Sequence, residues 1–157
     1  MVLYEIKDTS KVKELFEGWQ ETLIFSCLQN VMGKIYVTDL EQPKSAFAFV
    51  GCFGFYAGEP NVELVINKPE GFVIMVPQNE QWAALIEKYY SSAKKVIRYA
   101  IKKNTTFDVN MLRREIGKLP DGYELKRIDA EIYDQCLKNP ATEDFVSAFD
   151  SKEKYLQ

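Results

Sequence analysis

The stretch SAFAFVGCFGFY, residues 45–56, decides the fold. Its small, aromatic and β-branched side chains favour strands, and Gly51 and Gly54 stand where a tight turn or a bulge is expected. The stretch therefore predicts a glycine-kinked hairpin. If its register holds, four phenylalanines share one strand face: Phe47, Phe49, Phe53 and Phe55.

Two helices and one strand are predicted before this hairpin. Asp8 and its neighbours offer N-caps for a helix that Gly18 should end. A second helix is expected over residues 21–30, where apolar residues follow helical spacing. Residues 34–38, KIYVT, alternate like a strand.

The segment after the hairpin switches from strand spacing to helix spacing at Pro77. Residues 79–90 are expected to form a helix that packs on the sheet through Trp82, Leu85 and Ile86. Asp108 should cap a further short helix. Strands are predicted at residues 61–66, 72–76 and 95–101, the last two beside the hairpin.

The cluster KLPDG at residues 118–122 is a turn signal and the best candidate boundary. It divides the chain into an N-terminal domain, residues 1–119, and a second segment, residues 120–157. In the second segment we expect a strand at 123–128, helices at 130–137 and 142–149, and a charged stretch at 151–157. The overall interpretation is an α+β fold, with a mixed, mostly antiparallel sheet flanked by helices.

Composition excludes several classes of function. The formal net charge of −3 disfavours nucleic-acid binding, and the chain has no apolar run near the roughly 20 residues of a membrane helix. There is no histidine, which removes Ser-His and Cys-His nucleophile pairs and most zinc sites. The three cysteines stand in apolar contexts and are interpreted as reduced, buried thiols of a cytoplasmic protein.

No catalytic, cofactor-binding or metal-binding residue is predicted. The possible ligand-lining residues are Phe53, Phe55 and Tyr56 on the aromatic hairpin, and Glu59 beside Gly58 and Pro60. In the competing interpretation, the three aromatic residues only form part of the hydrophobic core of the sheet, and the glutamate is a solvated surface residue.

Several segments together resemble a bacterial branch of the GNAT acetyltransferase superfamily, in which an extra N-terminal domain precedes the acetyl-CoA-binding domain. They include GWQETLIFSCLQNVMGKIYV, PKSAFAFVGCFGFYAGEPN, IMVPQNEQW and RYAIKK, followed by GYELKRID and DFVSAF. The resemblance implies an N-terminal domain with a GNAT-like fold, followed from residue 120 by the start of a second, truncated GNAT domain.

What the family needs for its cofactor is missing from this chain. A GNAT domain holds acetyl-CoA at a strand-to-helix junction of the form Q/R-x-x-G-x-G/A, which does not occur here. At the junction taken as equivalent, residues 76–80, Pro77 has no N–H and Glu80 would repel a pyrophosphate. We therefore expect no cofactor in this chain, although acetyl-CoA is implied for a full-length relative.

The function implied is the N-terminal part of an acetyl-CoA-dependent N-acetyltransferase, which shapes the side that accepts a small amine and is inactive alone. The alternatives are a non-catalytic binding or protein-interaction module, and a small-molecule-binding domain that uses the aromatic face. If the strand at 123–128 has lost its partners, its free edge predicts self-association through residues 123–157. No nucleic acid or membrane partner is expected.

Overall fold

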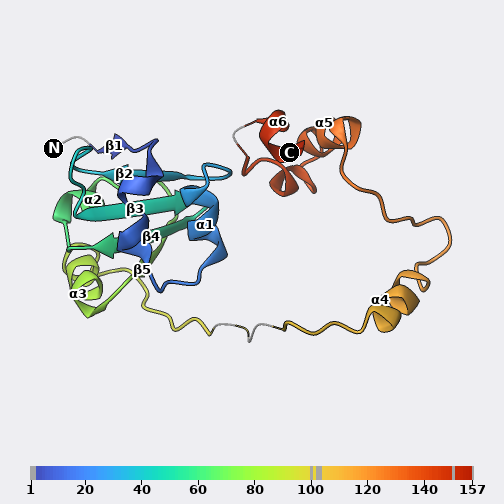
Figure 1. Ribbon diagram of the computed structural model, residues 1–157, viewed down its shortest axis with the longest axis horizontal. Coiled ribbons are helices and arrows are strands. Elements are labelled where there is room, and N and C mark those ends of the chain that lie inside the picture. Colours follow the sequence, from blue (N-terminus) through green and yellow to red (C-terminus); the bar gives the residue numbers. More distant parts are fainter. Residues whose placement is uncertain (1–2, 100, 102–103, 150, 157) are drawn as a thin grey trace.

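The computed structural model describes residues 3–99, 101, 104–149 and 151–156, and its centre is one mixed sheet (Figure 1). The sheet has the strand order β1-β2-β3-β4-β5, in which only the β4–β5 pair is parallel. This confirms the α+β, mostly antiparallel architecture predicted from the sequence. The strands are β1 (Tyr4–Glu5), β2 (Lys34–Val37), β3 (Ser45–Val50), β4 (Phe53–Gly58) and β5 (Ile74–Pro77).

The hairpin β3–β4 forms as predicted, but its register separates the phenylalanines. Val50 stands opposite Phe53, which leaves a two-residue turn in which Gly51 has a φ of 58°. Phe47 stands opposite Tyr56, and residues opposite one another point to the same face of a sheet. The prediction that the four phenylalanines share one strand face is therefore wrong. Phe47 and Phe49 lie on one face with Tyr56, whereas Phe53 and Phe55 lie on the other.

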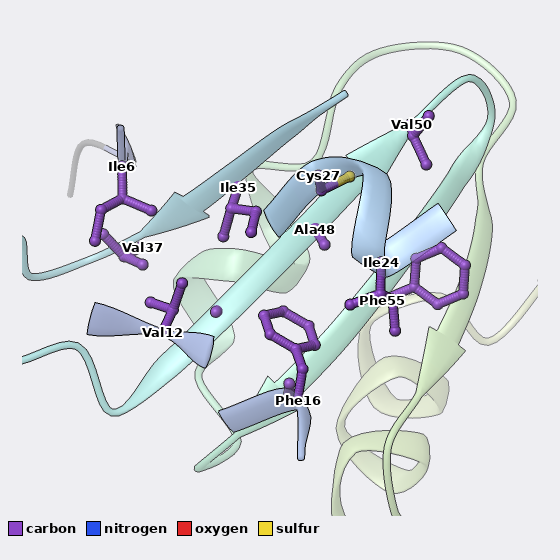
Figure 2. Close-up of a cluster of buried hydrophobic side chains, with 12 residues drawn as sticks. Ile6, Val12, Phe16, Ile24, Cys27, Ile35, Val37, Ala48, Val50 and Phe55 are labelled. Carbon is purple, nitrogen blue, oxygen red and sulfur yellow. The ribbon is translucent and has the colours of Figure 1, made fainter. Parts of the chain in front are cut away.

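One face of the sheet is covered by the N-terminal helical segments, as Figure 2 shows. The helix predicted after Asp8 is present only as two 3-10 turns, η1 (Thr9–Lys11) and η2 (Lys13–Phe16), followed by α1 (Thr22–Leu28). Phe16, Ile24 and Phe55 meet in this core. The buried members of the core are Ile6, Val12, Phe16, Ile24, Cys27, Ile35, Val37, Ala46, Ala48, Val50, Phe55 and Ala57.

The opposite face is covered by α2 (Val62–Ile66) and α3 (Glu80–Tyr89). Trp82 is fully buried and Ile86 nearly so, while Leu85 packs at the edge, which confirms the predicted packing of this helix. Tyr56 stacks between the rings of Phe47 and Trp82, at centroid distances of 4.6 and 5.3 Å. The sheet is therefore the middle layer of three, with a separate core on each side.

The strand predicted at residues 61–66 is wrong, because this segment is the helix α2. Asn61 caps it by accepting a hydrogen bond from the backbone N–H of Glu63 at 2.9 Å. The helix turns the chain so that β5 can return parallel to β4, a connection that an additional strand could not make. Leu64 and Val65 supply its buried side, whereas Ile66 is exposed.

After α3, the described residues 91–99, 101 and 104–128 leave the sheet as an extended segment that contains α4 (Val109–Ile116), capped by Asp108 as predicted. The strand expected at 95–101 is absent from its described residues, 95–99 and 101, and the strand expected at 123–128 is also absent. Both segments have alternating apolar residues, but a strand needs a neighbour to bond its backbone groups. Neither segment has a ladder partner among the described residues.

The C-terminal segment folds as a small helical cluster, made by α5 (Ala130–Lys138), η3 (Glu143–Phe145) and α6 (Lys152–Leu156). Its core is built on Tyr133, Cys136 and Val146. The helix predicted at 142–149 is present only as η3 and the turns that follow it. A β-bridge between Met32 and Phe149 joins this cluster to the turn after α1. Within the described ranges, no helix has the length and apolar character that crossing a membrane requires.

The hydroxyl of Tyr56 gives a test of the core between the sheet and the helices α2 and α3. This oxygen is buried without a hydrogen-bond partner, and burial raises the pKa of the phenol well above its ordinary value. A buried, unsatisfied polar group destabilises a fold by about 1–3 kcal/mol. Tyr56→Phe should therefore leave the free energy of unfolding unchanged or raise it by about 1 kcal/mol, as measured by urea denaturation.

The matched control is Tyr90→Phe, which removes the hydrogen bond from the Tyr90 hydroxyl to the carbonyl of Val65 at 3.1 Å. That variant should lose about 1 kcal/mol. If Tyr56→Phe is the more damaging of the two, the hydroxyl has a partner and this description of the core is wrong.

Candidate functional site

A polar cleft of about 290 Å³ lies where β4 ends and the chain crosses to α2. Glu59 stands at this crossing and also borders a second, more open hollow on its other side, together with Leu15 and Gln81. The residues that line the first cleft are Thr38, Asp39, Gln42, Lys44, Ser45, Glu59, Pro60 and Asn61. They come from the ends of β2 and β4 and the start of β3, so the sheet itself brings them together.

Three hydrogen bonds around Gly58 and Gln78 fix the end of β4 next to the cleft. The Gln78 amide oxygen accepts from the Gly58 N–H at 2.9 Å, and its amide nitrogen donates to the Leu15 carbonyl at 2.7 Å. The Trp82 indole donates to the Gly58 carbonyl at 2.8 Å. Gln78 therefore ties the end of β4 to the helical layer on one face, and Trp82 ties it to the layer on the other.

The walls of the cleft are fixed by local hydrogen bonds. The Asn61 amide donates to the Thr38 hydroxyl at 3.1 Å, and the Glu59 N–H donates to the Lys44 carbonyl at 2.9 Å. Asp39 accepts the backbone N–H groups of Glu41 at 2.8 Å and of Gln42 at 3.2 Å. These two bonds lower the pKa of the Asp39 carboxyl, so it stays ionised at neutral pH.

The chemistry of the cleft suits binding better than catalysis. Its ionic side chains are Asp39, Glu59 and Lys44, all of them exposed, and Ser45 is a buried hydroxyl residue at its base. Asp39 and Glu59 present their carboxylates to solvent. Their acceptor oxygens, with the amide of Gln42, can receive hydrogen bonds from a ligand rich in N–H or O–H donors.

The four candidate ligand-lining residues have different positions. Glu59 lines the cleft. Phe53 is half-buried on the first core, whereas Phe55 and Tyr56 are fully buried on opposite faces of the sheet. Sequence reasoning missed the residues that surround Glu59, such as Asp39, because sheet pairing brings together turns that lie far apart in the chain.

Thiol and metal chemistry do not point to a second site. Cys27 is buried, and burial raises the pKa of its thiol to about 12. A thiol held neutral at physiological pH is a poor nucleophile. Cys136 is also buried and Cys52 is half-buried; none of the three is in a disulfide. The residues that the structure describes contain no group of His, Cys, Asp or Glu side chains placed to hold a metal ion.

Comparison with known proteins places this chain in a family. A family model described as GNAT acetyltransferase matches residues 13–157. The chain is also similar to a solved structure, a GCN5-related N-acetyltransferase-like protein from Streptococcus suis 89/1591, with 37% sequence identity and a TM-score of 0.79. That similarity covers 95% of this chain but 61% of the other, so the chain spans about three fifths of its length. No match was found among curated proteins.

Gly58 gives a test of the cleft, because its backbone has a φ of 79° and a Cβ added there would collide with the Lys44 carbonyl. Gly58→Ala should lower the free energy of unfolding by about 2 kcal/mol or more. Gly51→Ala is the control: φ is 58°, but the added Cβ meets open space, so a loss of about 1 kcal/mol is expected. Equal losses in urea denaturation would show that the close approach of β4 to Lys44 is wrong.

Proposed function

Because the chain belongs to the GNAT acetyltransferase family, we propose that it forms the acceptor side of an acetyl-CoA-dependent N-acetyltransferase and is inactive alone. The observation that carries this proposal is the polar cleft beside Glu59. A small primary amine is a cation at neutral pH, and Asp39 and Glu59 provide carboxylates on the cleft wall. The cleft is therefore suited to hold an amine rather than to activate it.

The strand-to-helix junctions of this chain do not fit acetyl-CoA. In the described chain, two strands lead into an α-helix, β4 into α2 and β5 into α3. Each junction contains a proline, Pro60 or Pro77, that has no N–H to offer a phosphate. Asparagine caps already accept from the first-turn N–H groups, with Asn79 bonding Trp82 N at 3.1 Å. Acidic residues stand in both first turns, Glu63 and Glu80. A pyrophosphate would meet repulsion at either place.

These features support the view that the chain contains no cofactor site of its own, and no step of acetyl transfer is assigned to its residues. We propose that residues 1–119 form an N-terminal GNAT-like domain and that 120–157 begin a second, truncated one. We also place the protein in the bacterial cytoplasm. The three cysteines, which form no disulfide, are consistent with a reducing compartment.

Two titrations test the proposal. Calorimetry with acetyl-CoA should show no binding at physiological concentrations, because neither junction can accommodate the pyrophosphate. A small primary diamine should instead bind weakly, and its binding should shift the nuclear magnetic resonance signals of Asp39, Gln42 and Asn61. Micromolar, one-to-one binding of acetyl-CoA would contradict the assignment to the acceptor side.

A pair of substitutions distinguishes diamine binding at the cleft from attraction by the net negative charge of the chain. Glu59→Gln should weaken diamine binding by up to about fivefold, since one exposed ion pair contributes up to about 1 kcal/mol. Glu124→Gln removes the same charge from an exposed site outside the cleft and should leave binding unchanged. Equal effects of the two substitutions would show that the diamine follows net charge and that the cleft is not its site.

A further inference from the structure

Two adjacent spaces share one wall beside the end of β4. The polar cleft of about 290 Å³ lies on one side of this wall, and the more open hollow, of about 460 Å³, lies on the other. Three residues line both spaces and are called the divide below: Lys44, Glu59 and Pro60. Small-molecule sites commonly have volumes of about 300–1,000 Å³, so the two spaces together have room for a ligand that reaches across the divide.

The two charged side chains of the divide have opposite signs. The pair of Ser45 with Gly58 ends the β3–β4 ladder, and just beyond it the Glu59 N–H donates to the Lys44 carbonyl at 2.9 Å. The backbones of the two charged residues are therefore held side by side. Within the part of the chain that the structure describes, the Lys44 ammonium and the Glu59 carboxylate form no salt bridge or hydrogen bond, either with each other or with another residue. Both charges are available to a ligand.

This charge pattern discriminates between classes of amine. A ligand whose only charge is an ammonium is attracted by Glu59 and Asp39 but repelled by Lys44. A ligand that also has a carboxylate turns the contact with the lysine into an attraction. Asp39 lines the cleft but not the hollow, so a carboxylate that reaches Lys44 from the hollow stays away from it. The divide therefore favours a zwitterion, with its ammonium in the cleft and its carboxylate on the hollow side.

The lining of the hollow indicates what else the ligand has. Leu15 and Pro43 are half-buried there, and Pro60 is the apolar member of the divide. The Leu15 backbone is fixed because its carbonyl accepts from the Gln78 amide at 2.7 Å. Among the described lining residues outside the divide, the only polar side chain is the exposed amide of Gln81. An apolar group of the ligand would leave water in this hollow by packing against the leucine and the two prolines.

We propose that the amine received by the acceptor side is the α-amino group of a zwitterionic amino acid with an apolar side chain. Its ammonium lies in the cleft beside Asp39 and Glu59, and its carboxylate binds the Lys44 ammonium. Its side chain lies in the hollow against Leu15. This inference rests on the proposed function, because it names the class of amine that the cleft receives. It makes Lys44 the residue that selects amino acids over simple amines.

Leucine and isopentylamine are matched probes, because they differ only in the carboxylate. In titrations of the full chain, followed by the nuclear magnetic resonance shifts of the Lys44, Glu59 and Gln81 amides, leucine should bind about two- to fivefold more tightly, the gain expected from one exposed ion pair. Lys44→Met removes the ammonium, keeps an unbranched apolar stem and should abolish this difference. Lys13→Met removes the same charge from an exposed site on η2 outside both spaces and should preserve it.

Two further probes test the other contacts. 4-Methylpentanoate, which is leucine without its amino group, should bind more weakly than leucine because the carboxylates of the cleft then gain nothing. Alanine should bind about fivefold or more weakly, since it places little apolar surface in the hollow.

The outcomes separate this inference from the proposed function. Equal binding of leucine and isopentylamine, an equal loss of both in Lys44→Met, or alanine or 4-methylpentanoate binding as tightly as leucine would overturn the amino-acid inference. In those cases an amine still binds the cleft, or the diamine titration decides whether it does. If leucine, isopentylamine and the diamine all fail to bind, the acceptor-side proposal fails and this inference fails with it.

Discussion

The register of the β3–β4 hairpin is the constraint on which the rest of the structure depends. Pairing Phe47 with Tyr56 and Ala48 with Phe55 assigns alternate side chains to opposite faces, so one hairpin supplies the centre of both cores. A slip by one residue would exchange the two sets, placing the large ring of Tyr56 against α1 and Phe55 against Trp82. The helical layers on the two sides can therefore pack only after this register is set.

The β3–β4 hairpin also positions the residues that line the cleft. Gly58 is the last residue of β4, and its peptide is held from one side by Gln78 and from the other by Trp82. Its pairing with Ser45 places Glu59 beside the turn that carries Asp39 and Lys44. The cleft presents two exposed carboxylates, Asp39 and Glu59, beside the cation Lys44 and the buried Ser45.

The sequence predicted the elements in which the spacing of apolar residues shows which side chains are buried. The hairpin and the helix with Trp82 were predicted because periods of 2 and 3.6 are visible in a single sequence. The prediction failed where pairing with another strand decides the secondary structure of a segment. Residues 61–66 have strand composition but lie in the crossover to a parallel strand. Residues 95–99 have strand spacing but no ladder partner among the described residues. Glu59 was named as a candidate because of its place between Gly58 and Pro60, whereas Asp39 gave no signal because only the fold brings it near.

Native-state hydrogen exchange tests the dependence on the hairpin most directly. If both cores rest on its register, the amides of Phe47, Ala48 and Phe55 should exchange only through global unfolding, at the full free energy of unfolding measured with denaturant. Amides on the covering helices, such as Ile24 and Ile86, should open at equal or lower free energies. The account is contradicted if the hairpin amides exchange through a smaller opening while either helical layer stays protected, since that layer would then be stable without the hairpin.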